Sequence, residues 1–331
     1  MKIVLLASQP EKTTRLQMFK GTLQGMGHDV FVPKFNTRNW VGVAKQAKEF
    51  VKHQKPDVVH IFNVPDIIYH GFPKLKGTYF DKLIYDYRSP WAVEYGISYG
   101  PIVKRVCEHF EHELAAGADI ITTVNKPLAD KVGSYRGAKD KPIFIIPNYP
   151  RRDFSQTKGK VPQGMEDLEE GAIIFVGRIS KHEGIGSLLK LIKDMPDERF
   201  WIIGDGPFAK WYLRKMPLNA RFFGWQPHES ISFFVNKASL CLILLGETPL
   251  TPYATDKSVW KLNEYLSMEK IVVASGVTKE EDRKNLIVVK SRDLKDAVVK
   301  YLEKTPEKMT AEDYRYWDNN DRIIKEAYDS L

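Results

Sequence analysis

The sequence predicts an α/β protein of two Rossmann-like domains in succession, each with a doubly wound parallel sheet. Short apolar runs alternate with segments of helical periodicity from residue 2 to residue 148. The alternation stops over residues 149–171, which are polar, contain Pro and Gly and show no period, and which we interpret as a linker. It starts again at residue 172 and continues to residue 303. The length of 331 residues agrees with two domains.

In the first half, short apolar runs such as KIVLLAS predict the strands. Strands are expected at 2–8, 28–33, 56–63, 82–89, 118–125 and 142–148. Apolar residues at three- and four-residue steps predict helices at 13–26, 40–54, 103–116 and 127–135. Because helices alternate with strands, the sheet is expected to be parallel.

The second half shows the same pattern. Strands are expected at 172–177, 199–206, 220–225, 239–245, 271–275 and 285–290. Helices are expected at 184–195, 227–237 and 294–303, with a further helix in the tail at 311–331. Carboxyl ends of strands from both sheets are then available to a ligand.

The stretch 257–275 is expected to form a helix followed by a buried strand. One face of this helix is apolar, and another carries Lys257, Lys261 and Glu264 at three- and four-residue steps. The free N–H groups and the dipole of a helix start attract phosphate, and a carboxylate one or two turns later can bind a ribose diol. The alternative interpretation is a surface helix on which Lys261 and Glu264 only pair with each other.

Two loops after predicted strands are also suited to anions. Arg178 and Lys181 follow the strand at 172–177, where two cations three residues apart can hold a diphosphate. Gly204, Asp205 and Gly206 form a turn at which the backbone can approach a ligand closely. In isolation, the loop of Arg178 and Lys181 is equally compatible with an ordinary solvated turn, and most Gly-Asp-Gly turns are only turns.

Composition and cysteine usage indicate a soluble cytoplasmic protein. Hydrophobic residues make up 43% of the chain and charged residues 28%. The N-terminal apolar run is too short for a secretion signal, and no run approaches transmembrane length. The two cysteines, Cys107 and Cys241, have no metal-type spacing and are expected to be reduced thiols.

The net charge of +8 lies entirely in the first half. Residues 1–155 carry 23 Lys and Arg against 15 Asp and Glu, whereas residues 156–331 carry 27 of each. An anionic partner, such as a membrane surface or a phosphorylated acceptor, is one interpretation, and solubility is the other. Nucleic-acid binding is disfavoured because no recognition motif is present.

Several segments resemble retaining GT-B glycosyltransferases of family 4. IIFVGRISKHEGIGSLL, FWIIGDGP, RFFGW and KLNEYLSMEKIVVAS are similar to the nucleotide-sugar half of these enzymes. DVVHIFN, ADIITTVNKPLADKV and IIPNYP are similar to the acceptor half. The similarity covers most of the chain in the same order and spacing.

The resemblance implies roles for residues of the second half. Arg178 and Lys181 match the cations that bind the donor phosphates and stabilise the leaving diphosphate, and Glu264 matches the glutamate that binds the ribose. Asp256 stands where the family has a glutamate that contacts the transferred sugar. The expected donor-binding residues are Gly177, Arg178, Lys181, Gly204, Asp205, Gly206, Asp256, Ser258, Val259, Lys261 and Glu264.

In the first half, the resemblance places three charged residues near the reacting carbon. Asp86, Arg88 and Glu94 occupy the region where many relatives carry a His-Asp pair. Asp86 and Arg88 join Arg178 and Lys181 as expected catalytic residues, and Arg88 and Glu94 are expected on the acceptor side. The N-terminal loop SQPEKTTR lacks the paired glycines common in the family.

The resemblance implies hexosyl transfer from a UDP- or GDP-sugar to an acceptor hydroxyl, with retained configuration and no metal or cofactor. The cations would stabilise the leaving diphosphate. One rival function is a nucleotide-sugar-binding protein without catalysis, which the Asp256 departure and the missing glycines favour. A dinucleotide oxidoreductase is less favoured because neither half begins with strand–GxGxxG–helix.

The resemblance also implies the domain organisation. The acceptor domain is expected at 1–155 plus 311–331, because the last helix of this fold crosses back to the first domain, and the donor domain at 156–310. If the acceptor is a lipid-linked glycan, the basic first half would face the inner membrane surface as a peripheral protein, and segment 64–80 could insert shallowly.

Overall fold

The chain folds into two compact units. The computed structural model describes residues 1–157, 159–180, 183–206, 209–214 and 216–331. Unit 1 comprises residues 1–148 and 317–331, and unit 2 comprises residues 149–316. The boundaries expected from the sequence were 155/156 and 310/311. In the structure, the polar segment after residue 148 includes the short helix α6 (Arg152–Gln156) and belongs to unit 2.

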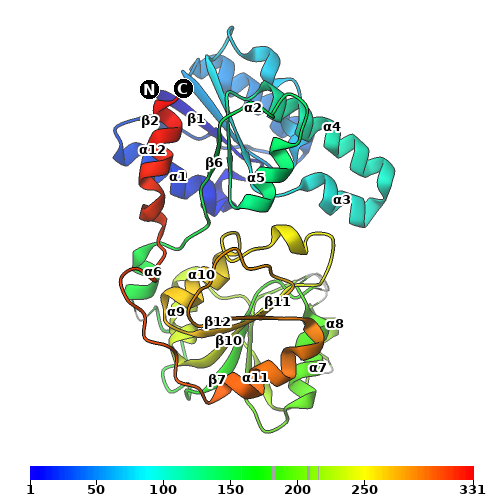
Figure 1. The fold of residues 1–331 in the computed structure, drawn as a ribbon, viewed down its shortest axis with the longest axis vertical. Helices are drawn as coiled ribbons and strands as arrows, with labels where there is room; N and C mark the ends of the chain where they lie inside the picture. Colours follow the sequence, from blue (N-terminus) through cyan, green and yellow to red (C-terminus); the bar gives the residue numbers. More distant parts are fainter. Residues whose placement is uncertain (158, 181–182, 207–208, 215) are drawn as a thin grey trace. The chain divides into compact units, whose positions relative to one another are not determined.

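Unit 1 contains a six-stranded parallel sheet with the strand order β2-β1-β3-β4-β5-β6 (Figure 1). Its strands are β1 (Lys2–Leu6), β2 (Asp29–Phe31), β3 (Val58–Phe62), β4 (Lys82–Tyr87), β5 (Ile120–Thr123) and β6 (Ile143–Ile145). Its α-helices are α1 (Thr14–Gly25), α2 (Trp40–Gln54), α3 (Trp91–Tyr99), α4 (Pro101–Gly117), α5 (Lys126–Gly133) and α12 (Asp321–Asp329). The strand order reverses between β1 and β3, where doubly wound sheets usually bind ligands.

Unit 2 repeats this architecture with the strand order β12-β11-β10-β7-β8-β9, again all parallel. Its strands are β7 (Ala172–Val176), β8 (Phe200–Ile203), β9 (Ala220–Phe222), β10 (Ala238–Leu244), β11 (Ile271–Ser275) and β12 (Leu286–Val289). Besides α6, its α-helices are α7 (Ile185–Asp194), α8 (Ala209–Leu213), α9 (His228–Lys237), α10 (Trp260–Ser267) and α11 (Leu294–Leu302). The strand order reverses between β7 and β10.

The central strands of both sheets are buried on both faces, as parallel sheets require. Residues of β1, β10 and β11 are nearly all apolar and inaccessible to solvent. In unit 2, two apolar clusters cover the two faces of the sheet, one built with α9 and α10 and the other with α7 and α11. The predicted fold of two doubly wound α/β domains is therefore confirmed.

The C-terminal helix belongs to unit 1, as predicted for the fold. The tail forms a 3-10 turn (Trp317–Asn320) followed by α12. Trp317 Nε1 donates to Thr22 Oγ1 at 2.9 Å, and the Tyr328 hydroxyl lies 2.7 Å from Nδ1 of His60. Trp317 and Tyr328 are buried in these contacts. The apolar stripe of the tail is therefore covered by unit 1 and not exposed to water.

Four helices and one segment differ from the prediction. Helices α3, α6 and α8 were not predicted, and α10 begins at Trp260 because residues 255–258 form a turn closed by a Thr255 N–H bond to Ser258 Oγ. Segment 64–80, of which some apolar residues could have added a shallow membrane insertion while many were expected in the core, is largely core: its large apolar residues include Ile68, Phe72 and Phe80, all buried. It therefore has few apolar side chains left to offer a bilayer.

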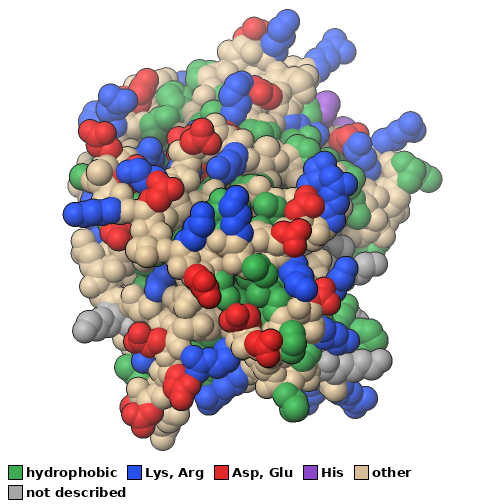
Figure 2. Space-filling model, turned by 60° about the horizontal axis from the view of Figure 1, so that its bottom comes forward, with side chains coloured by type: hydrophobic (Ala, Val, Ile, Leu, Met, Phe, Trp, Pro, Cys, Tyr) green, Lys and Arg blue, Asp and Glu red, His purple; other side chains and the backbone are tan. Residues whose placement is uncertain are grey.

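The surface carries charges of both signs. On the face drawn in Figure 2, cationic and anionic side chains are interspersed. No helix in the described part of the chain combines the length and the apolar character needed to cross a bilayer.

Candidate functional site

Unit 2 contains a pocket of about 440 Å³ at the carboxyl ends of β7 and β8. Its walls come from four places: the loops after these two strands, the segment after β9, the start of α9 and one face of α10. The lining residues are Val176, Gly177, Arg178, Ile203, Gly204, Asp205, Trp225, Gln226, His228, Ile231, Lys261 and Glu264. The structure thus brings together six of the eleven expected donor-binding residues.

Glycines allow the two strand-end loops to cross in direct backbone contact. Gly204 has a φ of +139°, and a Cβ there would lie 1.8 Å from the carbonyl oxygen of Gly177. A Cβ on Gly206 would lie 2.1 Å from the carbonyl oxygen of Ile179. The N–H of Ile179 donates to the Asp205 carbonyl at 2.9 Å, so the loops are joined as well as close. Larger residues would force the loops apart and reshape the pocket floor.

Glu264 is the buried carboxylate of the pocket. It is 8% exposed, and its Oε1 lies 2.7 Å from Nε2 of His228 at the start of α9. This hydrogen bond raises the pKa of His228, so the imidazolium form pairs with the carboxylate over a wider pH range. His228 was not predicted from the sequence, because an isolated histidine 36 residues from its partner has no sequence signal.

Two described cations reach the pocket. Lys261 on α10 extends toward the β7 end, where its Nζ lies 3.0 Å from Oε2 of Glu183 and a Cβ on Gly177 would approach it to 2.8 Å. Arg178 is exposed and forms no ion pair with another described residue. Its guanidinium is therefore available to an anion. Lys181, the second expected phosphate-binding cation, lies outside the described residues.

The remaining described residues expected to bind the donor are not among those that line the pocket. The Asp256 carboxylate is buried and its Oδ1 accepts a hydrogen bond from the Glu280 N–H at 2.6 Å. Burial raises the pKa of Asp256 above its ordinary value. Ser258 closes the turn before α10, and Val259 caps that helix. Residues 255–256 and 278–280 pack together. In the structure, the Asp256 carboxylate therefore contacts the backbone of another loop.

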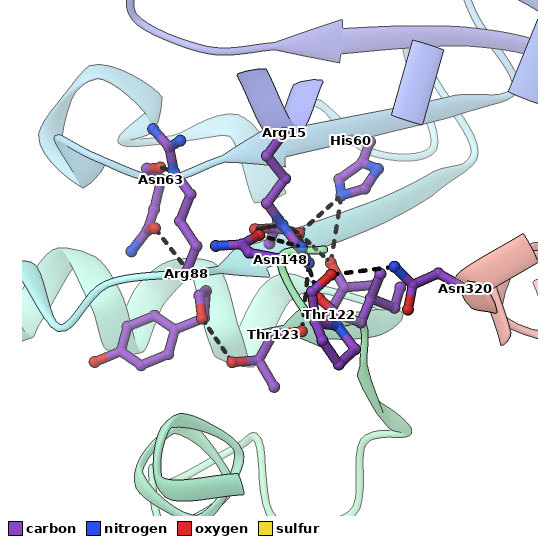
Figure 3. A network of polar contacts seen from close by, with 12 residues as sticks. Arg15, His60, Asn63, Arg88, Thr122, Thr123, Asn148 and Asn320 are labelled. Carbon is purple, nitrogen blue, oxygen red and sulfur yellow. Dashed lines mark hydrogen bonds and ion pairs between the residues drawn. The ribbon is translucent and has the colours of Figure 1, made fainter. Parts of the chain in front are cut away.

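In unit 1, the charged residues at the strand ends form a buried network (Figure 3). Asp86 at the end of β4 is inaccessible and accepts bonds from Nε of Arg15, at 2.9 Å to Oδ2, and from the Thr122 hydroxyl at 2.8 Å. Arg15 on α1 also donates to the carbonyl of Ile146 at 2.7 Å and to Oδ1 of Asn148 at 3.0 Å. Asp86 therefore has the environment of a supporting residue.

His60 borders this network and is neutral. Burial lowers the pKa of His60 well below its ordinary value, and the nearby Arg15 cation acts in the same direction. Its two ring nitrogens face the hydroxyls of Tyr328 and Thr122, at 2.7 and 3.4 Å. A neutral imidazole between two hydroxyls links α12 to the sheet without an uncompensated buried charge.

Arg88 and Glu94 lie closer to solvent than Asp86. The half-buried Arg88 donates from Nε to the Asn63 carbonyl, and its own N–H donates to Oδ1 of Asn63 at 3.1 Å. Glu94, at the start of α3, accepts from the Ser89 hydroxyl. The loops after β3 and β4 are thus joined through Asn63, which Figure 3 shows beside Arg88. Arg15, which anchors the whole arrangement, was missed because its partner is 71 positions away.

Part of the chain matches a known protein family. Residues 170–304 match the model of the family described as Glycosyl transferases group 1. No sequence of a curated protein matches the chain.

Solved structures with the same fold include the following three. Sucrose-phosphate synthase from Thermosynechococcus elongatus superposes with a TM-score of 0.70 at 13% identity, covering 99% of this chain and 94% of that one. HepE from Anabaena, solved with UDP and glucose, has a TM-score of 0.67 at 12% identity, with 100% and 96% covered. The UDP-GlcNAc 2-epimerase of Methanocaldococcus jannaschii has a TM-score of 0.61 at 11% identity, with 98% and 99% covered.

These similarities agree with the architecture described above. The structural likeness extends over both units, whereas the family match lies within unit 2, around the pocket. The chain therefore has the GT-B fold, and most of unit 2 is similar in sequence to the group 1 glycosyl transferases.

Proposed function

We propose that the protein transfers a sugar from a nucleotide-diphosphate sugar to an acceptor hydroxyl. The observation that carries the proposal is the pocket of unit 2, whose lining combines a buried carboxylate, Glu264, with two cations and a glycine-lined loop crossing. Glu264 would bind the ribose hydroxyls, and Arg178 and Lys261 would bind the diphosphate. The residues matched to the group 1 family include this pocket, which supports sugar transfer as the chemistry.

We propose that the transfer retains the anomeric configuration and needs no metal ion or cofactor. As the glycosidic bond breaks, negative charge develops on the diphosphate, and fixed cations can stabilise it in place of a metal. Arg178 and Lys181 are the residues assigned to this role. On the acceptor side, Arg88 and Glu94 would orient the hydroxyl, with Arg88 held in position by Asn63.

The donor is expected to be a UDP- or GDP-sugar. HepE, one of the structurally similar proteins, was solved with UDP and glucose. In the pocket of this chain, Trp225 and Gln226 follow β9 and offer an exposed indole face and an amide to a base. An acceptor glycan, free or lipid-linked, would bind unit 1.

The fold alone does not select this function, because an epimerase shares it. Epimerisation needs only a nucleotide sugar, whereas transfer also needs an acceptor. Incubation of the full chain with UDP-GlcNAc alone, followed by NMR, separates the two: interconversion to the 2-epimer would contradict the transferase proposal.

A thermal-shift screen of UDP-, GDP- and ADP-sugars is the first experiment. A ligand that binds only the folded state at a hundred times its Kd adds about 2.7 kcal/mol of stability, which is easily measured. Donors that stabilise the chain are then incubated with simple glycoside acceptors, with and without EDTA, and nucleotide release is followed. Stabilisation without release would favour a binding protein, and release abolished by EDTA would contradict the proposed role of the cations.

A further inference from the structure

Helices α3 and α4 form a hairpin in unit 1 whose turn is apolar. Helix α3 ends at Tyr99 and α4 begins at Pro101, so only Gly100, with a φ of +88°, joins them. Gly96 lets the helices pack closely, since a Cβ there would lie 2.9 Å from Cβ of Lys104. Figure 1 shows the two helices side by side at the edge of unit 1. Because the two helices pack closely, the turn between them is held in place.

Large apolar side chains at this turn are open to solvent. Ile102 is 77% exposed and Tyr99 is 67% exposed, which no requirement of the core of unit 1 explains. The start of α2 extends the surface: Val41 is 78% exposed, and the Trp40 ring lies 6.3 Å from that of Tyr95 on α3. We call this surface the apolar patch; its members are Trp40, Val41, Ile97, Tyr99, Ile102 and Val106.

The charges in the two stretches that build the apolar patch are all positive. The two stretches that build it are residues 30–48 and 95–107, and neither contains Asp or Glu. Together they contain six cations, which are Lys34, Arg38, Lys45, Lys48, Lys104 and Arg105. Their nearest acidic neighbours along the helices are Glu49, Glu94 and Glu108. Glu49 and Glu108 form surface pairs with Lys45 at 4.0 Å and Lys104 at 3.6 Å, and Glu94 accepts a hydrogen bond from the Ser89 hydroxyl. Such pairs contribute little and leave the positive character intact.

We propose that the apolar patch docks unit 1 onto an anionic lipid bilayer. Exposed Ile and Val would enter the boundary between headgroups and acyl chains, Trp40 and Tyr99 would lie at headgroup level, and the six cations would face anionic lipid. Apolar insertion and cationic attraction together give reversible docking, which either alone would not sustain. The inference extends the proposed function, because it gives unit 1 a membrane-bound acceptor.

The same surface is poorly suited to a second copy of the chain. A two-fold dimer through the apolar patch would bring six cations against six cations with no acid in either stretch to neutralise them. An anionic bilayer presents the complementary charge, and segment 64–80 is excluded as the contact by its burial. The positive charge therefore favours an anionic bilayer over a second copy of the chain as the partner of the apolar patch.

Flotation of the full-length protein with lipid vesicles tests the proposal. Vesicles of phosphatidylcholine alone are compared with vesicles containing about a third phosphatidylglycerol, at low and high salt. Binding is expected only to the anionic vesicles and is expected to fall as salt rises. Nucleotide binding, measured separately by thermal shift, reports on unit 2, so a failure of docking is distinguishable from a failure of the proposed function.

Two double variants separate the contributions of charge and apolar surface. Lys104→Gln with Arg105→Gln is expected to weaken vesicle binding by roughly thirtyfold, since each cation near an anionic leaflet contributes about fivefold. Tyr99→Ser with Ile102→Ser is expected to weaken it by at least about tenfold through lost apolar burial. Val299→Ser, at a 57% exposed position of α11, is the control and should leave binding unchanged.

A direct contact readout completes the experiment. A polarity-sensitive dye attached at Ile102→Cys should shift its emission to the blue on anionic vesicles, whereas the same dye at Val299→Cys should not; Cys107 and Cys241 are buried. Three results would overturn the proposal: no binding to anionic vesicles at low salt, equal loss in the Val299→Ser control, or a concentration-dependent dimer that Tyr99→Ser with Ile102→Ser abolishes in the absence of lipid.

Discussion

The two units have the same sheet architecture but treat charge at their strand ends in opposite ways. In unit 1, Arg15 and Asp86 are buried against each other and against backbone carbonyls. In unit 2, Arg178 is exposed and Lys261 has only a half-buried carboxylate partner, Glu183. The contrast teaches that the fold fixes where charged residues gather, whereas burial decides whether they support the structure or remain available to a ligand.

The largest expected effect is the loss of a buried charge partner in unit 1. Arg15→Met leaves Asp86 buried without its cation and should lower the free energy of unfolding by about 3–5 kcal/mol. Urea denaturation followed by circular dichroism measures the change. The exposed Arg136→Met in the same unit is the matched control. A loss below about 1 kcal/mol for Arg15→Met would show that the pair is not the anchor of the network.

Arg178→Ala should have the reverse profile, with lost activity and unchanged stability. Removal of one group that stabilises developing charge typically lowers kcat by about 10²-fold or more, with a smaller effect on KM. Steady-state kinetics with the donor identified by thermal shift gives both constants. Arg292→Ala, an exposed arginine after β12, is the control. If Arg178→Ala raises KM alone, the guanidinium serves ground-state binding only.

Lys181 is the second cation expected to bind the donor diphosphate, and it lies outside the described residues. Lys181→Ala should also lower kcat more than it raises KM for the donor, by roughly tenfold or more. Equal kcat values for Lys181→Ala and the unaltered protein would remove it from the proposed mechanism.

Glu264→Gln should weaken nucleotide binding by about 1–3 kcal/mol, because the amide accepts hydrogen bonds from ribose hydroxyls less strongly than a carboxylate does. Isothermal titration with the nucleoside diphosphate measures it. Glu229→Gln, which removes a surface carboxylate paired with Lys160, should bind normally. Unchanged affinity in Glu264→Gln would contradict the ribose assignment.

The smallest effect concerns pH. The hydrogen bond to Glu264 raises the pKa of His228 in the folded state, so this pair contributes stability at low pH and loses it as pH rises through the raised pKa. Because the imidazole is largely exposed, the contribution is expected to be a few tenths of a kcal/mol. Comparing the pH dependence of unfolding for His228→Gln and the unaltered protein measures it. An equal pH dependence of unfolding in the two proteins would show that solvent fully screens the His228–Glu264 pair.

The sequence predicts the long elements well and the site in part. Helix α2 and the buried strands follow from periodicity, because a repeated apolar face leaves one solution for burial. Helix α3 was not predicted, because its aromatic residues and Gly96 obscure the helical periodicity of the apolar residues. The resemblance pointed to Glu264, Arg178 and the glycine loops, all of which line the pocket.

What the sequence could not give were contacts between distant positions. The Arg15–Asp86 and His228–Glu264 pairs join residues 71 and 36 positions apart, and each partner alone resembles an ordinary surface charge. The burial of Asp256 depends on a backbone N–H from Glu280, which no side-chain pattern encodes. Such features exist only once the chain has folded.

The return of α12 to unit 1 has a consequence for the order in which the protein matures during synthesis. Unit 2 is one continuous stretch, so it can fold as soon as residue 316 has left the ribosome. Unit 1 must wait, because His60 meets its Tyr328 partner only after 268 further residues have been made. The segments of unit 1 that are made first therefore lack α12 for the whole time in which residues 149–316 are synthesised. Deletion of residues 317–331 should trap that state, and chaperones that shield exposed apolar surface would be expected to hold unit 1 until its last helix arrives.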